Sequence, residues 1–330
     1  MLEMLSTIAP MFLLLVLGFL AGFSPRFRAA QPGLNAFVFY LGLPSFIYSA
    51  ISTAPAMPGV PAGAILIAAG VTMSLAVAVY LLAKLMGGQA RDWAAPTSLA
   101  GTFGNVGYFG IPISISTVGP EAALAAGLVH LVHNVIYITG YPLVRTAAQL
   151  RGAGQEHGTG GSPEFRSIWR RKLWPIVRRA VLFNPVALAM LLAFFVATTG
   201  FGLPAVADEA LHMLGGTAVP VALFAVGLAM HPALDGIRSG GVPKRAIALG
   251  TAAKILVLPL LTWAAVLPIY DHLGPVWAAV LIIMAATPSS TTVFIFSEEY
   301  DGDGRLAAAI LVVGTLLSLL TIPLVAELLL

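Results

Sequence analysis

The sequence predicts an all-α integral membrane protein of ten transmembrane helices, arranged as two inverted five-helix repeats. Three observations predict this class: a very apolar composition, ten long apolar runs, and a one-sided distribution of lysine and arginine. Of the 330 residues, 58% are hydrophobic and 9% are charged, and the mean hydropathy is +0.93. Soluble domains carry about 25% charged residues. A lipid bilayer is therefore the expected solvent.

Each apolar run is near or above the roughly 20 residues that a helix needs to cross the hydrocarbon core of a bilayer. The apolar residues are continuous and do not alternate, so a transmembrane β-barrel fits poorly. The first run lacks the basic region and cleavage site of a signal peptide and is expected to be helix 1. The chain has no cysteine, which excludes disulfides and cysteine metal sites. The runs cover residues 6–23, 34–52, 63–86, 97–118, 122–147, 181–200, 206–230, 246–267, 276–296 and 306–328.

The distribution of basic residues predicts how the chain is oriented in the membrane. If the N-terminus lies outside, all lysines and arginines except Lys254 fall on the inside. This bias predicts a plasma (inner) membrane protein with both termini outside. Residues 148–179 then form a basic cytoplasmic linker. The pI of about 9.3 requires no nucleic acid, because the inside-positive bias and attraction to membrane lipids account for it.

The two halves of the chain resemble each other. The stretch LAAGLVHLVHNVIYITGYPLV from Leu124 resembles LAAAILVVGTLLSLLTIPLV from Leu306. We therefore expect a first repeat over residues 1–147 and a second over 180–330. Because each repeat contains an odd number of helices, the second must be inverted, which places a binding site at the midplane between them.

Helices 4 and 9 of this layout are interrupted in their middle by residues that break helices. Irregular backbone at this depth is tolerated only inside protein or beside a wet cavity; ordinary proline kinks are the alternative. The free N–H groups of the following half-helices, with their dipoles, would attract a carboxylate. The candidate substrate-binding residues are Asn105, Gly107, Gly110 and Pro112 in helix 4, and Thr287, Pro288, Ser289, Ser290 and Thr291 in helix 9.

Four further polar residues in apolar runs are candidates for ion coupling or for support of the breaks. Lys254 is expected to act as a fixed cation beside the breaks or as a proton carrier; snorkelling to the inner interface is the alternative. His130, His133 and Asn134 are expected to support the helix 4 break by hydrogen bonding, with proton coupling as the minority interpretation. The two histidines lack a third ligand nearby, so no metal site is expected.

Three segments resemble the auxin efflux carrier family of prokaryotic and plant transporters, which belongs with the bile acid, arsenite and riboflavin transporters. They are Asn105-Val106-Gly107-Tyr108-Phe109-Gly110-Ile111-Pro112, Ser297-Glu298-Glu299-Tyr300, and the stretch from Gly314 to Leu324. The resemblance implies a fold similar to sodium/proton antiporters and bile acid symporters, with crossed broken helices 4 and 9. Helices 1, 2, 6 and 7 would form a scaffold, and helices 3–5 with 8–10 a mobile transport domain.

The resemblance also implies what the chain does: it would be an elevator-type secondary carrier of a small organic anion. Bacterial relatives are associated with malonate, malate and similar mono- or dicarboxylates, and plant relatives with auxin-like acids. A cation/proton antiporter and a sensor with a transporter fold are the alternatives. An enzyme is not expected, because no nucleophile and base converge at one depth. No cofactor is expected. The partners expected besides the substrate are membrane lipids, protons for coupling and a second copy in a homodimer.

Overall fold

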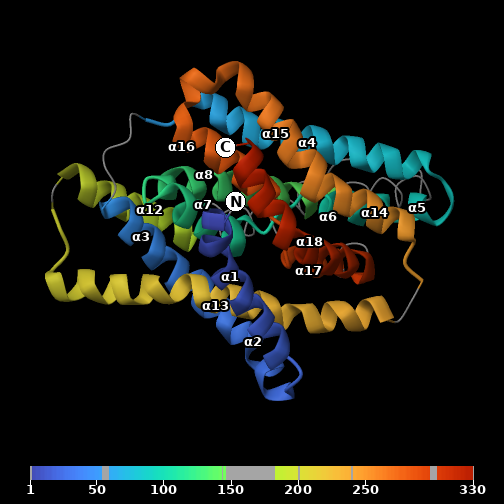
Figure 1. Ribbon diagram of the computed structural model, residues 1–330, viewed down its shortest axis with the longest axis horizontal. Helices are drawn as coiled ribbons and strands as arrows, with labels where there is room; N and C mark the ends of the chain where they lie inside the picture. The colour runs from blue at the N-terminus through green and yellow to red at the C-terminus, as the bar shows by residue number, and fades with distance from the viewer. Residues whose placement is uncertain are drawn as a thin grey trace, which may run out of the picture.

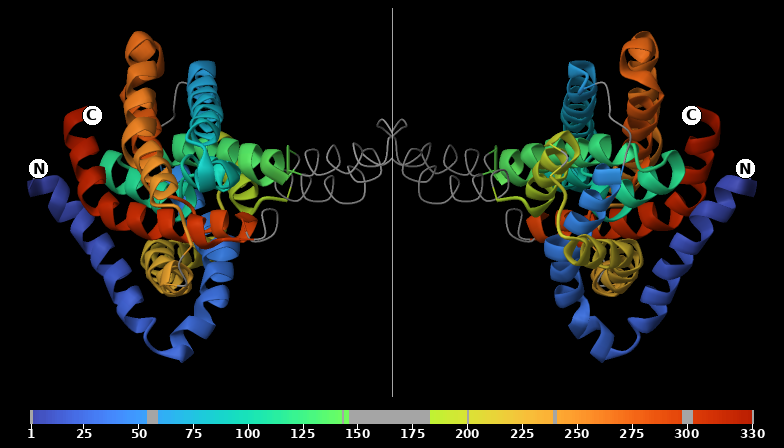
Figure 2. Two further views of the ribbon diagram at one scale, coloured as in Figure 1. Left: turned by 90° about the vertical axis from the view of Figure 1, so that its right-hand side faces the viewer. Right: turned by 90° about the vertical axis from the view of Figure 1, so that its left-hand side faces the viewer.

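A computed structural model describes residues 2–53, 59–142, 144–145, 183–199, 201–238, 241–297 and 303–329. These residues form helices and, apart from one isolated bridge, no β structure. The predicted linker over 148–179 lies outside the described residues, as do Glu298, Glu299 and Tyr300 of the second resembling segment. Both ends of the chain lie on the same side of the molecule (Figures 1 and 2).

The helices of the first half follow the predicted runs, with several interruptions. Helix α2 begins at Pro25, before the predicted start at 34, so Arg26 and Arg28 lie on a helix and not in a loop. The elements are α1 (Leu2–Ala21), α2 (Pro25–Phe37), η1 (Val38–Gly42), α3 (Leu43–Thr53), α4 (Ala62–Leu85), α5 (Gly88–Asp92), α6 (Ala94–Ala100), η2 (Val106–Gly110), α7 (Ile111–Val118), α8 (Ala122–Asn134) and η3 (Val135–Gly140). Here η1, η2 and η3 are π-helical turns within longer helices.

The second half is also a series of helices with interruptions. Its elements are α12 (Pro185–Thr199), α13 (Ala205–Arg238), α14 (Lys244–Ala252), η5 (Ala253–Val257), α15 (Leu258–Val266), η6 (Leu267–Ile269), α16 (Tyr270–Ala286), α17 (Thr292–Phe296) and α18 (Arg305–Leu329). Residues 244–286 read as one long apolar segment, but Gly274 has a φ of 75° and interrupts it. A positive φ is readily adopted only by glycine. The chain therefore turns back here, and α15 packs beside α16 (Figure 1).

Among the described residues, five helical segments are long and apolar enough to cross a membrane. They are Pro25–Ser52, Ala62–Leu85, Ala205–His231, Lys244–Ala286 and Arg305–Leu328. Shorter apolar helices cover Ala9–Ala21, Val106–Val118, Ala122–Ile138 and Pro185–Thr199. The chain is thus an all-helical membrane protein; ten crossings in inverted repeats stay a prediction.

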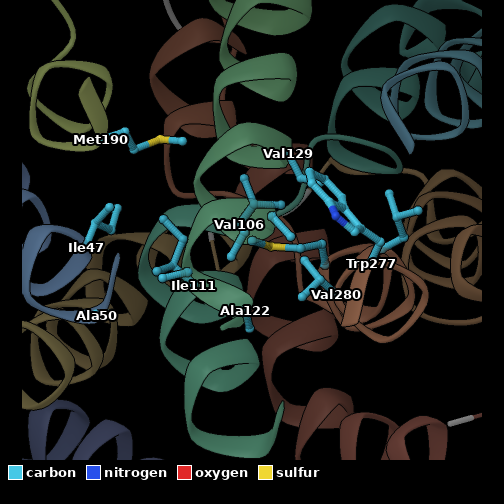
Figure 3. Packing of buried hydrophobic residues seen from close by; sticks show 14 of the residues in the cluster. Ile47, Ala50, Val106, Ile111, Ala122, Val129, Met190, Trp277 and Val280 are labelled. Carbon is cyan, nitrogen blue, oxygen red and sulfur yellow. The ribbon is translucent and has the colours of Figure 1, made fainter. Parts of the chain in front are cut away.

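Two packing arrangements position the broken helices. Helices α1 and α2 lie on either side of α13, like the arms of a V around it (Figure 2). The main apolar core lies between α3, α12, α8 and α16. Figure 3 shows Ile47 and Met190 on one side of this core and Val129 and Trp277 on the other. Val106 and Ile111 extend this core to η2 and α7, so apolar side chains hold the break between α6 and η2 in place.

Candidate binding site at the crossing of two broken helices

The two broken helices cross each other and pair through their backbones. Asn105 N donates to Pro288 O at 2.7 Å, and Ser290 N donates to Phe103 O at 2.9 Å. These bonds form an antiparallel bridge between Gly104 and Ser289. Each break thereby supplies hydrogen-bond partners for backbone groups that the other break leaves unpaired. An unpaired backbone group in an apolar environment costs free energy.

Asn105 shapes the first break. Helix α6 ends at Ala100, and the next helical segment begins at Val106. The side-chain Oδ1 of Asn105 accepts from Tyr108 N at 3.2 Å, so it caps that segment. The Nδ2 of the same amide is buried and has no hydrogen-bond partner. Pro112 lies buried in the first turn of α7. One face of the Asn105 amide is therefore used by the fold, and the other is free.

The second break is lined by hydroxyl groups. Thr287 Oγ1 donates to Met284 O at 2.8 Å, closing the last turn of α16. Ser290 Oγ accepts from Thr292 N at 3.3 Å at the start of α17. Thr291 is half-buried beside it. The Oγ of Ser289, in contrast, is buried without a partner. The crossing thus contains two unpaired polar groups, one from each broken helix: Asn105 Nδ2 and Ser289 Oγ.

The glycines of the first break permit close approach. A Cβ at Gly104 would lie 2.5 Å from Thr287 Oγ1 and 3.0 Å from Lys254 Nζ. A Cβ at Gly107 would lie 3.0 Å from His130 Cε1, and one at Gly110 would lie 2.2 Å from the Met284 sulfur. Gly104 was not among the residues singled out from the sequence, although it contacts both the second break and Lys254.

Lys254 lies beside the crossing. Its side chain is 1% exposed, and Nζ donates to Ala285 O at 2.6 Å. It therefore does not snorkel toward an interface. Ala285 belongs to the last turn of α16, where unpaired carbonyls carry partial negative charge. The ammonium group thus occupies the position where a cation is most favourable.

Of the polar residues of α8, His130 packs against the first break, and His133 does not. Asn134 Nδ2 donates to His130 Nε2 at 2.9 Å, and the His130 ring packs on Gly107. His133 faces α4 instead, with its Nε2 3.3 Å from Thr72 Oγ1. The two histidines therefore have different partners. Within the described ranges, no three histidine, aspartate or glutamate residues come close enough to hold a metal ion.

Two residues near the crossing were missed by sequence reasoning. Tyr108 carries the backbone amide that orients Asn105, and its hydroxyl donates to Asn35 O at 3.3 Å. Thr72 hydrogen-bonds His133. Tyr108 lies inside the segment that resembles the family signature, which was a usable signal. Thr72 is an isolated threonine in an apolar run and gave none.

The charge around the crossing is one-sided. In the part of the chain that the structure describes, no aspartate or glutamate side chain is buried, whereas Lys254 is. The Lys254 amine, the unpaired Asn105 amide and the N-terminus of a half-helix together present hydrogen-bond donors and partial positive charge at the crossing. Such a site is suited to hold an anion.

An apolar helical bundle with two broken helices crossing inside it is typical of membrane transport proteins. The chain belongs to the membrane transport protein family, which includes the auxin efflux carriers: the family model matches residues 4–326.

Three relatives show this similarity along almost their whole length. The chain is 26% identical to a Rhizobium meliloti (strain 1021) protein named "Putative malonate transporter", over 98% of this chain and 94% of the relative. It is 25% identical to auxin efflux carrier component 8 of Arabidopsis thaliana, over 97% and 95% of the two chains. It is also 25% identical to an uncharacterized transporter of Methanothermobacter thermautotrophicus, over 88% and 86%.

Proposed function

We propose that this transporter is a secondary active carrier of a small organic anion, bound where the two broken helices cross. The observation that carries this proposal is the pair of buried, unpaired groups, Asn105 Nδ2 and Ser289 Oγ, beside the buried Lys254 ammonium. Unpaired buried polar groups are costly, so a ligand that satisfies them gains that free energy on binding. A carboxylate accepts hydrogen bonds from both groups and balances the positive charge.

The substrate class proposed is a mono- or dicarboxylate such as malonate or malate, or an auxin-like acid. The printed names of two relatives, one with malonate and one with auxin, agree with a carboxylate as cargo. Asn105, Ser289, Ser290 and Thr291 would orient it, and the glycines and prolines of the two breaks would keep the backbone open for it. Lys254, with His130, His133 and Asn134 behind the first break, would maintain the charge of the site or carry a coupled proton.

A cation/proton antiporter is the second transport hypothesis. Such a protein needs acidic groups in the membrane interior to bind its cation. The absence of a buried carboxylate among the described residues argues against it. A sensor with a transporter fold would share the same geometry and differ only in showing no flux.

The movement proposed is an elevator movement between two groups of helices. The scaffold group is α1, α2, η1, α3, α12 and α13, and the transport group is α4, α6–α8 and α14–α18. Tyr48 Oη to Asp208 and His231 to Phe19 O are hydrogen bonds within the scaffold group. Much of the contact between the groups is apolar, with Phe12 of α1 against Phe109 of η2. An apolar interface can slide without breaking many directional bonds.

The test is flux in proteoliposomes on a solid-supported membrane, for mono- and dicarboxylates and indole acids, at two pH values, with and without sodium. Asn105→Asp is the decisive variant, because it keeps the Oδ1 that accepts from Tyr108 N but replaces the free donor with negative charge. We expect flux of the transported acid to fall by roughly tenfold or more, the equivalent of about 1.4 kcal/mol in binding.

Thr198→Ala is the matched control, because this exposed hydroxyl bonds only to carbonyls of its own helix. It should leave flux unchanged, and both variants should show the thermal unfolding midpoint of the original chain. Full flux in Asn105→Asp would remove Asn105 from the site. Absence of flux for every acid, with folded protein, would favour the sensor.

A further inference from the structure

A groove lies on the surface between α14, η5 and α18. It has a volume of about 420 Å³ and an apolar lining apart from Lys244 at one end and Thr251 in its wall. The lining residues are Lys244, Ile247, Ala248, Thr251, Ala252, Ile255, Leu256, Val313 and Leu317. From Lys244 to Leu256 the helix rises roughly 18 Å, at 1.5 Å per residue. One leaflet of the hydrocarbon core is about half of roughly 30 Å, so the groove matches the length of one acyl chain.

The basic end of this groove carries an unusual excess of positive charge. Lys244 and Arg245 are the first two residues of α14, and both are exposed. A helix N-terminus already carries about half a positive charge, so lysine and arginine are unfavourable there. The capping residue is Pro243, which has no side-chain acceptor for the free N–H groups. Neither basic residue forms an ion pair within the described part of the chain. This end of the helix therefore has positive charge that no acidic group in the described part of the chain balances.

A second polar group in the groove has no partner. The Thr251 side chain is 5% exposed and lines the groove, and its Oγ1 makes no hydrogen bond. It lies two turns beyond Lys244 on the same helix. An ester group of a lipid that enters the groove from the basic end could accept a hydrogen bond from it.

A second groove of about 470 Å³, between α4 and α15, offers a comparison. Its lining is Gly63, Leu66, Ile67, Gly70, Val71, Ser74, Leu261 and Ile269, with no basic residue. An apolar groove alone would accept any lipid. Of these two grooves, the α14–α18 groove is the one that combines an acyl-sized channel with unpaired basic residues at a helix N-terminus.

We propose that the α14–α18 groove is a binding site for an anionic phospholipid, with the phosphate at Lys244, Arg245 and the N-terminus of α14, and one acyl chain along α14 and α18. A lipid in this groove would lie close to the crossing, because Thr251 and Ile255 line the groove and flank Lys254 on the same helix. The lipid would lie against the face of the helix next to the one that holds the buried Lys254 amine, because residues three apart are neighbours on a helix. This site does not depend on the proposed substrate, since binding is measured without transport.

The test measures lipid binding to the detergent-solubilised full chain by native mass spectrometry, with phosphatidylglycerol, phosphatidylcholine and soluble glycerol 3-phosphate as probes. We expect phosphatidylglycerol to be retained in preference to phosphatidylcholine. The Lys244→Gln/Arg245→Gln double variant should bind phosphatidylglycerol roughly thirtyfold more weakly, since each of the two basic residues near an anionic lipid contributes about 1 kcal/mol. Ala248→Trp, which fills the groove without changing charge, should also weaken binding.

The matched control is Lys84→Gln/Arg91→Gln, which removes two other exposed basic residues that do not line this groove. It should leave binding unchanged. Equal weakening in the control would mean general attraction to charge and would overturn the site. Displacement of the lipid by glycerol 3-phosphate alone would overturn the acyl groove. A dimer that Ala248→Trp dissociates, without lipid retention, would show that a second copy covers this face.

Discussion

Asn105 and Lys254 lie at helix ends of opposite polarity in the crossing. Lys254 donates to Ala285 O at the C-terminal end of α16, where the helix dipole is negative. Asn105 lies at the N-terminal end of η2, where the dipole is positive and its Nδ2 is free. The lysine thus takes the place that a bound cation would otherwise fill. In the proposed function, this arrangement is what would favour anions over cations at the crossing.

We predict that Lys254→Met lowers flux by roughly tenfold or more, or makes it dependent on an added cation such as sodium. Methionine keeps much of the side-chain length but removes the charge. It leaves the Ala285 carbonyl unsatisfied, which costs about 1–3 kcal/mol when such a group is buried. The measurement is flux against pH and sodium concentration.

Lys84→Met serves as the control for Lys254→Met, because Lys84 is exposed and stacks only over Tyr80, 5.6 Å from the ring centre. Its ion profile should match that of the original chain. If Lys254→Met also retained the original pH and sodium profile, Lys254 would have a structural role only.

At this scale the sequence pointed to residues that the structure brings together at the crossing, but it could not identify every partner. The break residues and Lys254 stood out because polar and helix-breaking residues are rare in apolar runs. The partner of Lys254 could not be predicted, because Ala285 contributes a backbone carbonyl that no side-chain pattern marks. The role of Gly104 was hidden for a similar reason: a close approach between segments far apart in sequence becomes visible only when they are folded together.

Among the elements, α1 and α13 form the closest helix pair. A Cβ at Gly18 would lie 2.1 Å from Phe224 O, and one at Gly227 would lie 2.2 Å from Leu15 O. Small residues at such positions let helices in lipid pack backbone against backbone. The His231 ring adds a stacked contact with Phe19, 4.7 Å between ring centres. The α1–α13 pair therefore forms a tight contact within the proposed scaffold.

We predict that Gly227→Ala destabilises the protein, because the added methyl group would meet the backbone of α1. Overpacking of this kind costs about 1–3 kcal/mol. Thermal unfolding in detergent should show a lower midpoint. Gly216→Ala in the same helix has nothing within 4 Å of the added Cβ and should be neutral or stabilising by up to about 1 kcal/mol. Equal midpoints for the two variants would contradict the close crossing.

The helices themselves were largely predictable and their irregularities were not. Continuous apolar runs require helices in lipid, so the positions of α4, α13 and α18 followed from composition. The π-helical turns η1, η3 and η5 have no such signature, because they arise from how neighbouring helices pack. The turn at Gly274 falls between the predicted runs 246–267 and 276–296, so an interruption there was expected, but its exact position became clear only from the positive φ.

At the scale of the whole molecule, the interface between the two proposed groups gives a direct test of movement. The chain contains no cysteine, so engineered cysteines are the only thiols. Phe12 and Phe109 lie on opposite sides of the interface, with ring centres 6.2 Å apart. We predict that bridging Phe12→Cys and Phe109→Cys with a short bifunctional thiol reagent stops flux, because it ties the groups together.

The control for this bridge is the pair Phe103→Cys and Tyr137→Cys, whose native rings stack 4.4 Å apart within the transport group. Bridging this pair should leave flux intact, and reduction of a cleavable reagent should restore flux to the first pair. Continued flux with Phe12 and Phe109 bridged would rule out sliding at this interface.

The backbone bridge at the crossing also bears on how the protein is made. During synthesis, Asn105 and Phe103 enter the membrane long before Pro288 and Ser290 exist. Until then the first break lacks the partners that satisfy its backbone, and lipid cannot supply them. The first break therefore cannot complete its backbone pairing with residues from the first half of the chain. A ribosome must deliver the polypeptide as far as Ser290 before the crossing can close.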